Sequence, residues 1–214
     1  MASVAVIDYG MGNLHSIAKA LKTASAHSDV IVSADKDTIL SADRVVFPGV
    51  GAIRDCMNAL HNTGLGETIK QVANDKPLLG ICIGMQALLQ HSEENGGIDC
   101  LGILPGNVVR FPKGLEDSNN NKLKIPHMGW NEVNNTNKDP LFNKIDQNER
   151  FYFVHSYFAT NVGSENVIAT TKYPRKFPCA LRFKNIVAVQ FHPEKSQHAG
   201  LQLLTNFLNW DGQS

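Results

Sequence analysis

Residues 77–89 change from a strand pattern to a helix pattern across two glycines. Apolar residues 78–81 are typical of a short buried strand, and residues 85–89 continue with a helical pattern. Between them, Gly-x-Cys-x-Gly has the form of a nucleophile elbow, a sharp turn that lifts Cys82 clear of a sheet. The thiol would then sit at a helix N-terminus, where partial positive charge favours the thiolate. A buried structural cysteine in an ordinary strand–loop–helix joint fits the same pattern.

Short strand patterns alternate with helical patterns through the first 90 residues. Strands are predicted at residues 4–7, 30–32, 45–47 and 78–81, and helices at 14–21 (with Asn13 as N-cap), 35–41 and 52–74, the last broken at Thr63-Gly64. Strands linked through helices by short connections are typical of a parallel α/β sheet. In such a sheet, ligand sites gather at the carboxyl ends of the strands.

The pattern changes after residue 101, where strands follow one another without long helices between them. They are predicted at residues 108–111, 130–133, 151–160, 167–171, 180–183 and 186–190, with a polar loop before them at 91–97. The pair Lys184-Asn185 reads as a two-residue hairpin connection. We therefore expect antiparallel strands that extend the parallel sheet and add a small second layer. An amphipathic helix at 199–210 closes the chain, and residues 1–214 are expected to form a single domain.

The overall composition is that of an ordinary globular protein, with 43% hydrophobic and 19% charged residues in 214. Twenty basic residues balance 20 acidic ones, which argues against nucleic acid as the main partner. Four scattered cysteines show neither metal-ligand spacing nor a disulfide framework, so no metal is expected. Neither a signal peptide nor a membrane span is predicted, and we expect a cytoplasmic protein that does not bind membranes.

A nucleophilic thiol needs a base, and the base needs an orienting group. His192 follows the apolar strand 186–191, so it lies at a strand's carboxyl end, as Cys82 nearly does. Glu194 comes two residues later and would project to the same side in an extended segment, where it could hold the imidazole. These three residues form a coherent triad, with an accidental His-Pro-Glu turn as the alternative. By contrast, His155 lies within an apolar strand and is interpreted as a satisfied core histidine.

A second glycine-bearing segment, Pro48-Gly49-Val50-Gly51, ends another predicted strand. Two glycines around Val50 allow a backbone amide to point outward, where it could stabilise an oxyanion. A plain turn is the simpler interpretation of the spacing. The Gly10-Met11-Gly12 segment lacks the third glycine of a dinucleotide-binding loop, which argues against a nucleotide site there.

Taken together, the motifs at residues 80–86 and 190–194 resemble those of class I (triad) glutamine amidotransferases. Within that class, the chain is similar to the glutaminase subunits of imidazole glycerol phosphate synthases. This similarity rests on residues 8–13, 48–52, 126–131 and 192–196, in order over essentially the whole length. The resemblance implies a flavodoxin-like open sheet with a mostly parallel core, extended by antiparallel strands and covered by helices on both faces. It implies no cofactor.

The resemblance also implies a reaction. Cys82 would attack the glutamine carboxamide and form a γ-glutamyl thioester, while His192, oriented by Glu194, would protonate the departing ammonia and then activate water. The oxyanion hole would use the backbone N–H of Ile83 and one from the segment Gly49, Val50 and Gly51, with Val50 as the donor. In the family this segment is misdirected at rest, so that a peptide must flip before catalysis.

Two further sets of residues are carried over from the resemblance. The substrate glutamine would be held by Gln86, Glu94, Ser156 and Tyr157, with Glu94 pairing with its α-ammonium. A separate (βα)8-barrel cyclase subunit would form a heterodimer with the chain. It would use the ammonia to make imidazole glycerol phosphate and aminoimidazole carboxamide ribonucleotide in histidine biosynthesis. The residues facing that partner would be Asn13, Lys124, Trp130, Tyr152 and Lys195.

Other functions fit parts of the same sequence. A paralogue would feed ammonia to a different acceptor, for example in cell-surface sugar biosynthesis, and a stand-alone γ-glutamyl hydrolase shares the nucleophile. Lys195 and Trp130 with their motifs favour the two-subunit synthase. An inactive regulatory or scaffolding subunit is a third alternative, against which the intact triad counts.

Overall fold

A sheet with a parallel half and an antiparallel half runs through the protein, described by a computed structural model of residues 2–117, 119–136 and 138–213. Its parallel half contains, in spatial order, β2 (Asp29–Ser33), β1 (Ser3–Ile7), β3 (Arg44–Gly49), β4 (Leu78–Cys82) and β13 (Ile186–Val189). Nearly every side chain of β1, β3, β4 and β13 is buried. This burial agrees with their continuous apolar sequences, since strands covered on both faces need no polar alternation.

The antiparallel half continues from β13. It consists of β12 (Lys176–Phe183), β11 (Val167–Lys172), β8 (His127–Asn135) and β9 (Glu149–His155). Phe183 pairs with Ile186, so the predicted two-residue hairpin connection is confirmed. The prediction of one mostly parallel sheet extended by antiparallel strands is confirmed as well.

A second, smaller sheet has the order β10 (Tyr157–Thr160), β7 (Asn107–Arg110), β5 (His91–Ser92) and β6 (Ile98–Asp99). It corrects two expectations. The single strand predicted at 151–160 is wrong, because the chain bends at Ser156 and divides between the two sheets, with His155 Nδ1 2.8 Å from the Tyr157 carbonyl oxygen across the bend. The polar loop predicted at 91–97 is also wrong in part, since it contains β5 and the 3₁₀ turn η1 (Glu94–Gly96).

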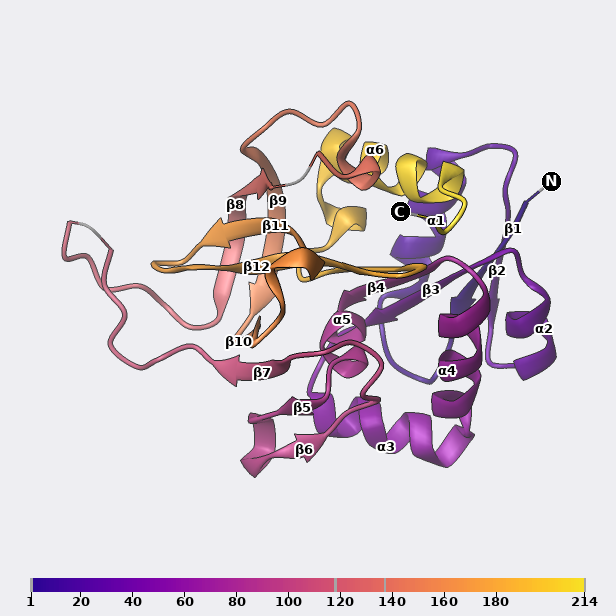
Figure 1. The fold of residues 1–214 in the computed structure, drawn as a ribbon, viewed down its shortest axis with the longest axis horizontal. Helices are drawn as coiled ribbons and strands as arrows, with labels where there is room; N and C mark the ends of the chain where they lie inside the picture. The colour runs from indigo at the N-terminus through magenta and orange to yellow at the C-terminus, as the bar shows by residue number, and fades with distance from the viewer. Residues whose placement is uncertain (1, 118, 137, 214) are drawn as a thin grey trace.

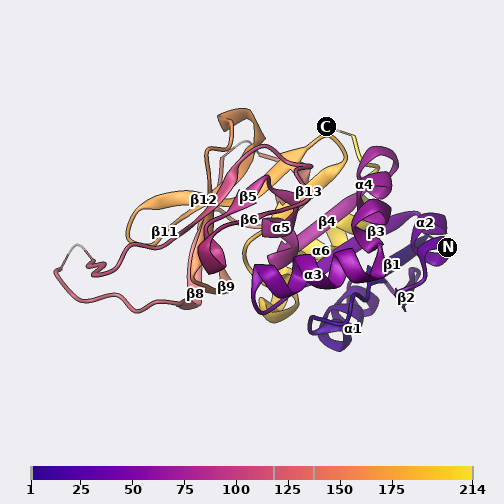
Figure 2. The same ribbon diagram turned by 90° about the horizontal axis from the view of Figure 1, so that it is seen from below.

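Helices cover both faces of the main sheet, as predicted (Figures 1 and 2). On one face lie α1 (Leu14–Ala24) and α6 (Gln197–Asn209), and on the other α2 (Lys36–Ser41), α3 (Ile53–Thr63), α4 (Leu65–Asp75) and α5 (Ile83–Leu88). The Asn13 side chain caps α1 by accepting from Ser16 N, and Gly64, at φ 70°, separates α3 from α4 where the break was predicted. No helix of the described ranges combines the length and apolar character needed to cross a membrane.

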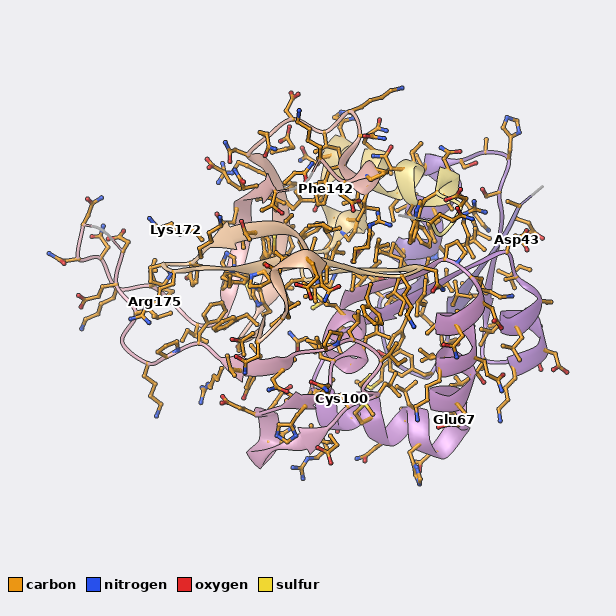
Figure 3. All side chains as sticks on the ribbon, in the orientation of Figure 1. Asp43, Glu67, Cys100, Phe142, Lys172 and Arg175 are labelled. Carbon is orange, nitrogen blue, oxygen red and sulfur yellow. The ribbon has the colours of Figure 1, made fainter. Side chains whose placement is uncertain are left out.

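Aromatic side chains fill the space between α6 and the antiparallel half of the sheet. Phe142, labelled in Figure 3, lies on the turn η2 (Pro140–Phe142) with its ring centroid 6.5 Å from that of Phe151. Phe151 in turn lies 4.3 Å from Phe191, which ends the segment leading to His192. The core therefore extends to the residues immediately before His192.

The start of α5 packs directly against the backbone of β3. A Cβ atom on Gly84 would lie only 2.0 Å from the Phe47 carbonyl oxygen. No side chain fits such an approach, since real Cβ contacts below 3.0 Å are essentially absent. Gly84 therefore sets the position of α5 against the sheet.

We expect Gly84→Ala to lower the free energy of unfolding by about 3 kcal/mol, because the added methyl meets immobile backbone rather than a flexible side chain. Urea denaturation of the purified variant measures this loss. Gly66→Ala in α4 is the matched control: its Cβ would meet no atom closer than 3.4 Å, and it should be no less stable than the wild type. Wild-type stability of Gly84→Ala would contradict the packing argument.

Candidate active site

Cys82 occupies a strained turn between β4 and α5. Its backbone has φ 54° and ψ −109°, a conformation that non-glycine residues rarely adopt. The strand ends at Cys82 and the helix begins at the next residue, so the strand–turn–helix form expected of residues 77–89 is present. The side chain is only 4% exposed, but it reaches a cavity.

This cavity, of about 520 Å³, collects most of the predicted site residues. The residues of the predicted triad, oxyanion and glutamine-binding sets that line it are Cys82, His192, Val50, Gly51, Ile83, Gln86, Glu94, Ser156 and Tyr157. Asn13 and Lys195, predicted to face the partner, line it as well. Pro126, Val154 and His155 also line it and were missed by the sequence reasoning. Pro126 could have been found, because it begins the motif at 126–131.

His192 and Glu194 form a buried pair. Imidazole Nδ1 lies 2.8 Å from the Glu194 carboxylate, with side-chain exposures of 2% and 4%. Glu194 reaches the imidazole from the short turn η4 (Pro193–Lys195), not from the extended segment that was expected. The His192 amide also donates to the Tyr152 carbonyl at 2.9 Å, which fixes the backbone at the base of the ring.

The environment of His192 favours its charged form. Burial opposes the charge, but the proximity of Cys82 and Glu194 outweighs it and raises the pKa of His192 to about 10, with Nδ1 bonded to Glu194 and Nε2 without a hydrogen-bond partner among the described residues. The other three thiols are held neutral. Burial is the main cause that raises the pKa of Cys56 and of Cys100 to about 12, and it also raises the pKa of Cys179. Cys82 is thus the thiol beside a histidine whose pKa is raised.

A hydrogen-bonded pair of glutamines lies beside Cys82. Gln190 Nε2 is 3.7 Å from the Cys82 sulfur, and Gln190 Oε1 accepts from Gln86 Nε2 at 2.9 Å. The same Gln86 nitrogen also donates to the Tyr157 carbonyl at 3.1 Å. Gln190 was not predicted as a site residue, although it begins the motif that contains His192.

The segment of residues 49–51 lies alongside the elbow because β3 pairs with β4. Gly49 is opposite Cys82 in the register, and a Cβ at Gly49 would lie 2.8 Å from both Ile83 Cβ and the Tyr9 hydroxyl. Gly51 has φ 93°, a conformation suited to glycine. Gly49 does not line the cavity, whereas Val50 and Gly51 do.

Glu94 links the cavity wall to α3. Its carboxylate accepts from the Ile53 amide at 3.0 Å, at the start of a helix whose own N-cap residue, Ala52, has no polar side chain. Arg54 also donates to the Asn95 carbonyl, which adds a second connection between α3 and η1. Glu94 therefore stabilises the helix that directly follows the segment 49–51.

Of the residues predicted to face a partner, Asn13 and Lys195 line the cavity and the others do not. Trp130, 38% exposed, lies with its ring 6.1 Å from that of Tyr152, and Lys195 Nζ lies 5.7 Å from the same Tyr152 ring. Lys195 thus connects the Tyr152 ring to the cavity that it lines. Lys124 does not line the cavity but lies two residues before Pro126, which does, and its carbonyl accepts from the Tyr173 hydroxyl.

Two buried histidines, His127 and His155, are held neutral. Burial lowers the pKa of His127 to about 3, and unfavourable charging next to His155 adds to the shift. Burial also lowers the pKa of His155 to about 4; the hydrogen bond to the Tyr157 carbonyl opposes this shift, and the charge of His192 adds to it. His155 was interpreted as a satisfied core histidine. The structure keeps it buried but also places it at the cavity wall.

Comparison with known proteins shows what the chain is similar to. A family model described as glutamine amidotransferase class-I matches residues 5–210. The imidazole glycerol phosphate synthase subunit HisH of Methylococcus capsulatus is 57% identical over 212 residues, covering 99% of this chain and 98% of the relative. That of Pseudomonas putida is 54% identical over 213 residues and covers all of both chains. A solved glutamine amidotransferase structure shares the fold, with a TM-score of 0.72, 17% identity and 96% coverage of both chains.

The buried neutral histidines predict loss of stability in acid. Each has a pKa lowered in the folded state, so the unfolded chain binds more protons once the pH falls below about 6.5. The raised pKa of His192 does not oppose this, since that group is protonated in both states there. We expect the unfolding free energy to fall by about 2 kcal/mol between pH 6 and pH 5.

Urea denaturation at the two pH values measures this loss. The double variant His127→Phe with His155→Phe should lose most of the dependence, and an undiminished slope in that variant would contradict the assignment.

Proposed function

The chain belongs to the class-I glutamine amidotransferase family, and on this basis we propose that it is the glutaminase subunit of an imidazole glycerol phosphate synthase. It would hydrolyse L-glutamine to glutamate and ammonia for histidine biosynthesis. The observation that carries the proposal is a strained cysteine and a histidine at one cavity, with a carboxylate 2.8 Å from that histidine, in a chain whose synthase relatives match it end to end. Residues 1–214 would act as a single glutamine amidotransferase domain.

The first half of the reaction is acylation of Cys82. Its sulfur attacks the carboxamide carbon, a C–S bond forms, and the carbonyl oxygen takes the negative charge. His192 is oriented for proton transfer by the 2.8 Å contact with Glu194 and gives its proton to the leaving nitrogen. The C–N bond breaks and ammonia departs, leaving a γ-glutamyl thioester.

The second half is hydrolysis. His192, now neutral, takes a proton from water, and the resulting hydroxide attacks the thioester carbon. The C–S bond breaks, glutamate leaves, and the thiolate–imidazolium pair is restored. The raised pKa of His192 supports the first half of the cycle, because it favours the proton on the group that must deliver it.

Backbone amides would stabilise the oxyanion. The first donor is the N–H of Ile83, at the start of α5, and the second is that of Val50, from the segment paired with the elbow. Gly49 and Gly51 on either side give the Val50 peptide the freedom to turn its N–H toward the cavity. The substrate would be held by Gln86, Glu94, Ser156 and Tyr157, which line the same cavity.

A partner subunit would complete the enzyme, in keeping with the names of the relatives. We propose that it is a (βα)8-barrel cyclase that receives ammonia from the cavity and makes imidazole glycerol phosphate and aminoimidazole carboxamide ribonucleotide. The exposed side chains of Met128 and Trp130 support a docking face there, since large aromatic and apolar side chains are enriched at interfaces. Asn13, Lys124, Tyr152 and Lys195 would contribute to the same contact. The four unpaired thiols support a reducing, cytoplasmic setting.

Cys82→Ser tests the chemistry directly. We expect glutamine hydrolysis to fall by at least about 10³-fold, because a serine hydroxyl beside the same base is a much weaker nucleophile than a thiolate. The synthase complex should still use added ammonium, since the cyclase step does not need the thiol. Glutamate release and product formation are measured separately.

Cys100→Ser is the matched control, because Cys100 lies outside the cavity, and it should keep full activity. Loss of ammonium-dependent synthesis in Cys82→Ser would show that the role of Cys82 is not confined to glutamine hydrolysis.

Partner binding should raise the glutaminase rate. We expect the isolated chain to hydrolyse glutamine slowly, and the partner with its nucleotide ligand to accelerate it about tenfold or more by favouring the productive Val50 peptide. Steady-state assays with and without the partner measure the ratio, and equal rates would refute this coupling.

Trp130→Ala should weaken partner binding about tenfold or more, as expected for an exposed aromatic anchor that the partner buries, and titration of the partner into each variant measures the dissociation constant. Val32→Ala is the control, because Val32 is a similarly exposed apolar residue, 42% against 38%, on β2 at the opposite edge of the sheet.

A further inference from the structure

His127 and His155 form a buried hydrogen-bonded pair that the proposed reaction does not use. His127 Nδ1 lies 2.9 Å from His155 Nε2, and their exposures are 3% and 5%. They belong to neighbouring strands, β8 and β9, which lie side by side in Figure 1 and pair these two residues directly. The pair is close to the chemistry, because His155 lines the cavity and the charge of His192 acts on it.

The hydrogen bonds around the pair run in one direction. Asn131 Nδ2 is 3.1 Å from His127 Nε2 and also donates to the carbonyl of Lys172, a residue labelled in Figure 3. The Asn131 oxygen accepts from the Glu132 amide at 2.9 Å, so the amide orientation is defined. His127 Nε2 is therefore an acceptor, and its proton lies on Nδ1 and is donated to His155 Nε2.

The position of the proton on His155 follows in the same way. Its Nε2 accepts from His127, so its proton lies on Nδ1, which faces the Tyr157 carbonyl at 2.8 Å. A second proton on His155 would point its Nε2–H at the Nδ1–H of His127. A second proton on His127 would point its Nε2–H at the Asn131 amide nitrogen, which is a donor. Burial keeps both rings neutral, which agrees with this arrangement. The His127 ring is also clamped, stacked 4.0 Å from Tyr173 and 4.8 Å from Phe153.

The Tyr157 carbonyl connects this arrangement to the active site. It accepts from His155 and also from Gln86 Nε2, at 3.1 Å. A side-chain amide is nearly symmetric in shape, so its orientation is decided by the groups around it. The Tyr157 backbone oxygen and the Gln190 side-chain oxygen both accept from Gln86 Nε2. If the Gln86 amide were turned over, its own oxygen would face these two oxygens.

This orientation leaves the Gln86 oxygen for a ligand. Gln86 Oε1 is buried and accepts no hydrogen bond from the described residues, while the residue lines the cavity beside Cys82. A buried acceptor without a donor is costly, so the site is complete only when something in the cavity donates to it.

We propose that His127 and His155 are positioning residues for the substrate, which fix Gln86 through the Tyr157 carbonyl so that its amide oxygen accepts an N–H of the bound glutamine. This inference rests on the proposed glutaminase function. It assigns a role in substrate binding, not in bond breaking, because neither imidazole hydrogen-bonds to the triad within the described ranges.

The test compares two replacements of His155 in the assembled synthase. His155→Phe keeps a ring but removes the donor to Tyr157, whereas His155→Asn places an amide N–H near the position of Nδ1. We expect His155→Phe to raise the KM for glutamine about tenfold with kcat within about threefold, and His155→Asn to restore most of the KM. His127→Phe should produce a smaller change in the same direction.

A double-mutant cycle with Gln86→Met separates positioning from general damage. In that background the amide is absent, so His155→Phe should no longer change KM. The rate of Cys82 alkylation by iodoacetamide should be the same in the two His155 variants as in the wild type, since His192 and Glu194 are untouched. An equal rise in KM in both backgrounds, or an effect only on stability, would overturn the proposal.

A second readout does not depend on activity. In ¹⁵N NMR spectra of the wild type near pH 7, both rings should be neutral with the proton on Nδ1, and the Gln86 side-chain amide resonance should move in His155→Phe but not in His155→Asn. Protonation on Nε2, or an unmoved Gln86 resonance, would overturn the positioning role. Absence of glutamine hydrolysis in the wild type, with these NMR results as expected, would instead refute the proposed function alone.

Discussion

The close approach of α5 to β3 is the constraint on which the active site depends. Cys82 is held at φ 54°, a conformation that costs about 1–3 kcal/mol and persists only where the surroundings determine it. Those surroundings are β4 on one side and the start of α5 on the other, fixed by the contact of Gly84 with the Phe47 carbonyl. The strain at the nucleophile is thus maintained by the same backbone packing that holds the central sheet to its helix layer.

The cavity is bordered by two polar systems that differ in charge. His192 and Glu194 form a system in which a proton is favoured on the imidazole, because each neighbour can be negative. His127 and His155 form a system in which a proton is excluded, because the rings are buried among aromatic side chains and face one another. The first suits proton transfer, and the second suits fixed orientation. Their separation lets one wall of the cavity change its protonation while the other keeps its hydrogen bonds.

Much of this arrangement could be predicted from local sequence patterns. The parallel strands are continuous apolar runs, and the elbow has glycines at the two positions where backbones touch, so β4, α5 and the place of Cys82 follow from residues 77–89. The division of 151–160 could not be predicted, because the apolar pattern runs straight through Ser156 and gives no sign of the bend, which the hydrogen bond between His155 and Tyr157 spans. His155 was interpreted as a core residue for the same reason. Its burial follows from the apolar strand pattern. Its place at the cavity depends on the bend after it, where the chain passes from the main sheet to the smaller one.

The segment of residues 49–51 is held at both ends, and this limits how it can move. Before it, Gly49 is fixed in the ladder opposite Cys82, with no room for a side chain against Ile83 and Tyr9. After it, the first amide of α3 is held by Glu94, which lines the cavity as well. A rotation confined to the peptides of Val50 and Gly51 leaves both anchors in place, whereas a displacement of the whole segment would break the ladder or the cap. In the proposed reaction, a substrate that binds Glu94 would therefore act on this segment through the residue that holds its following anchor.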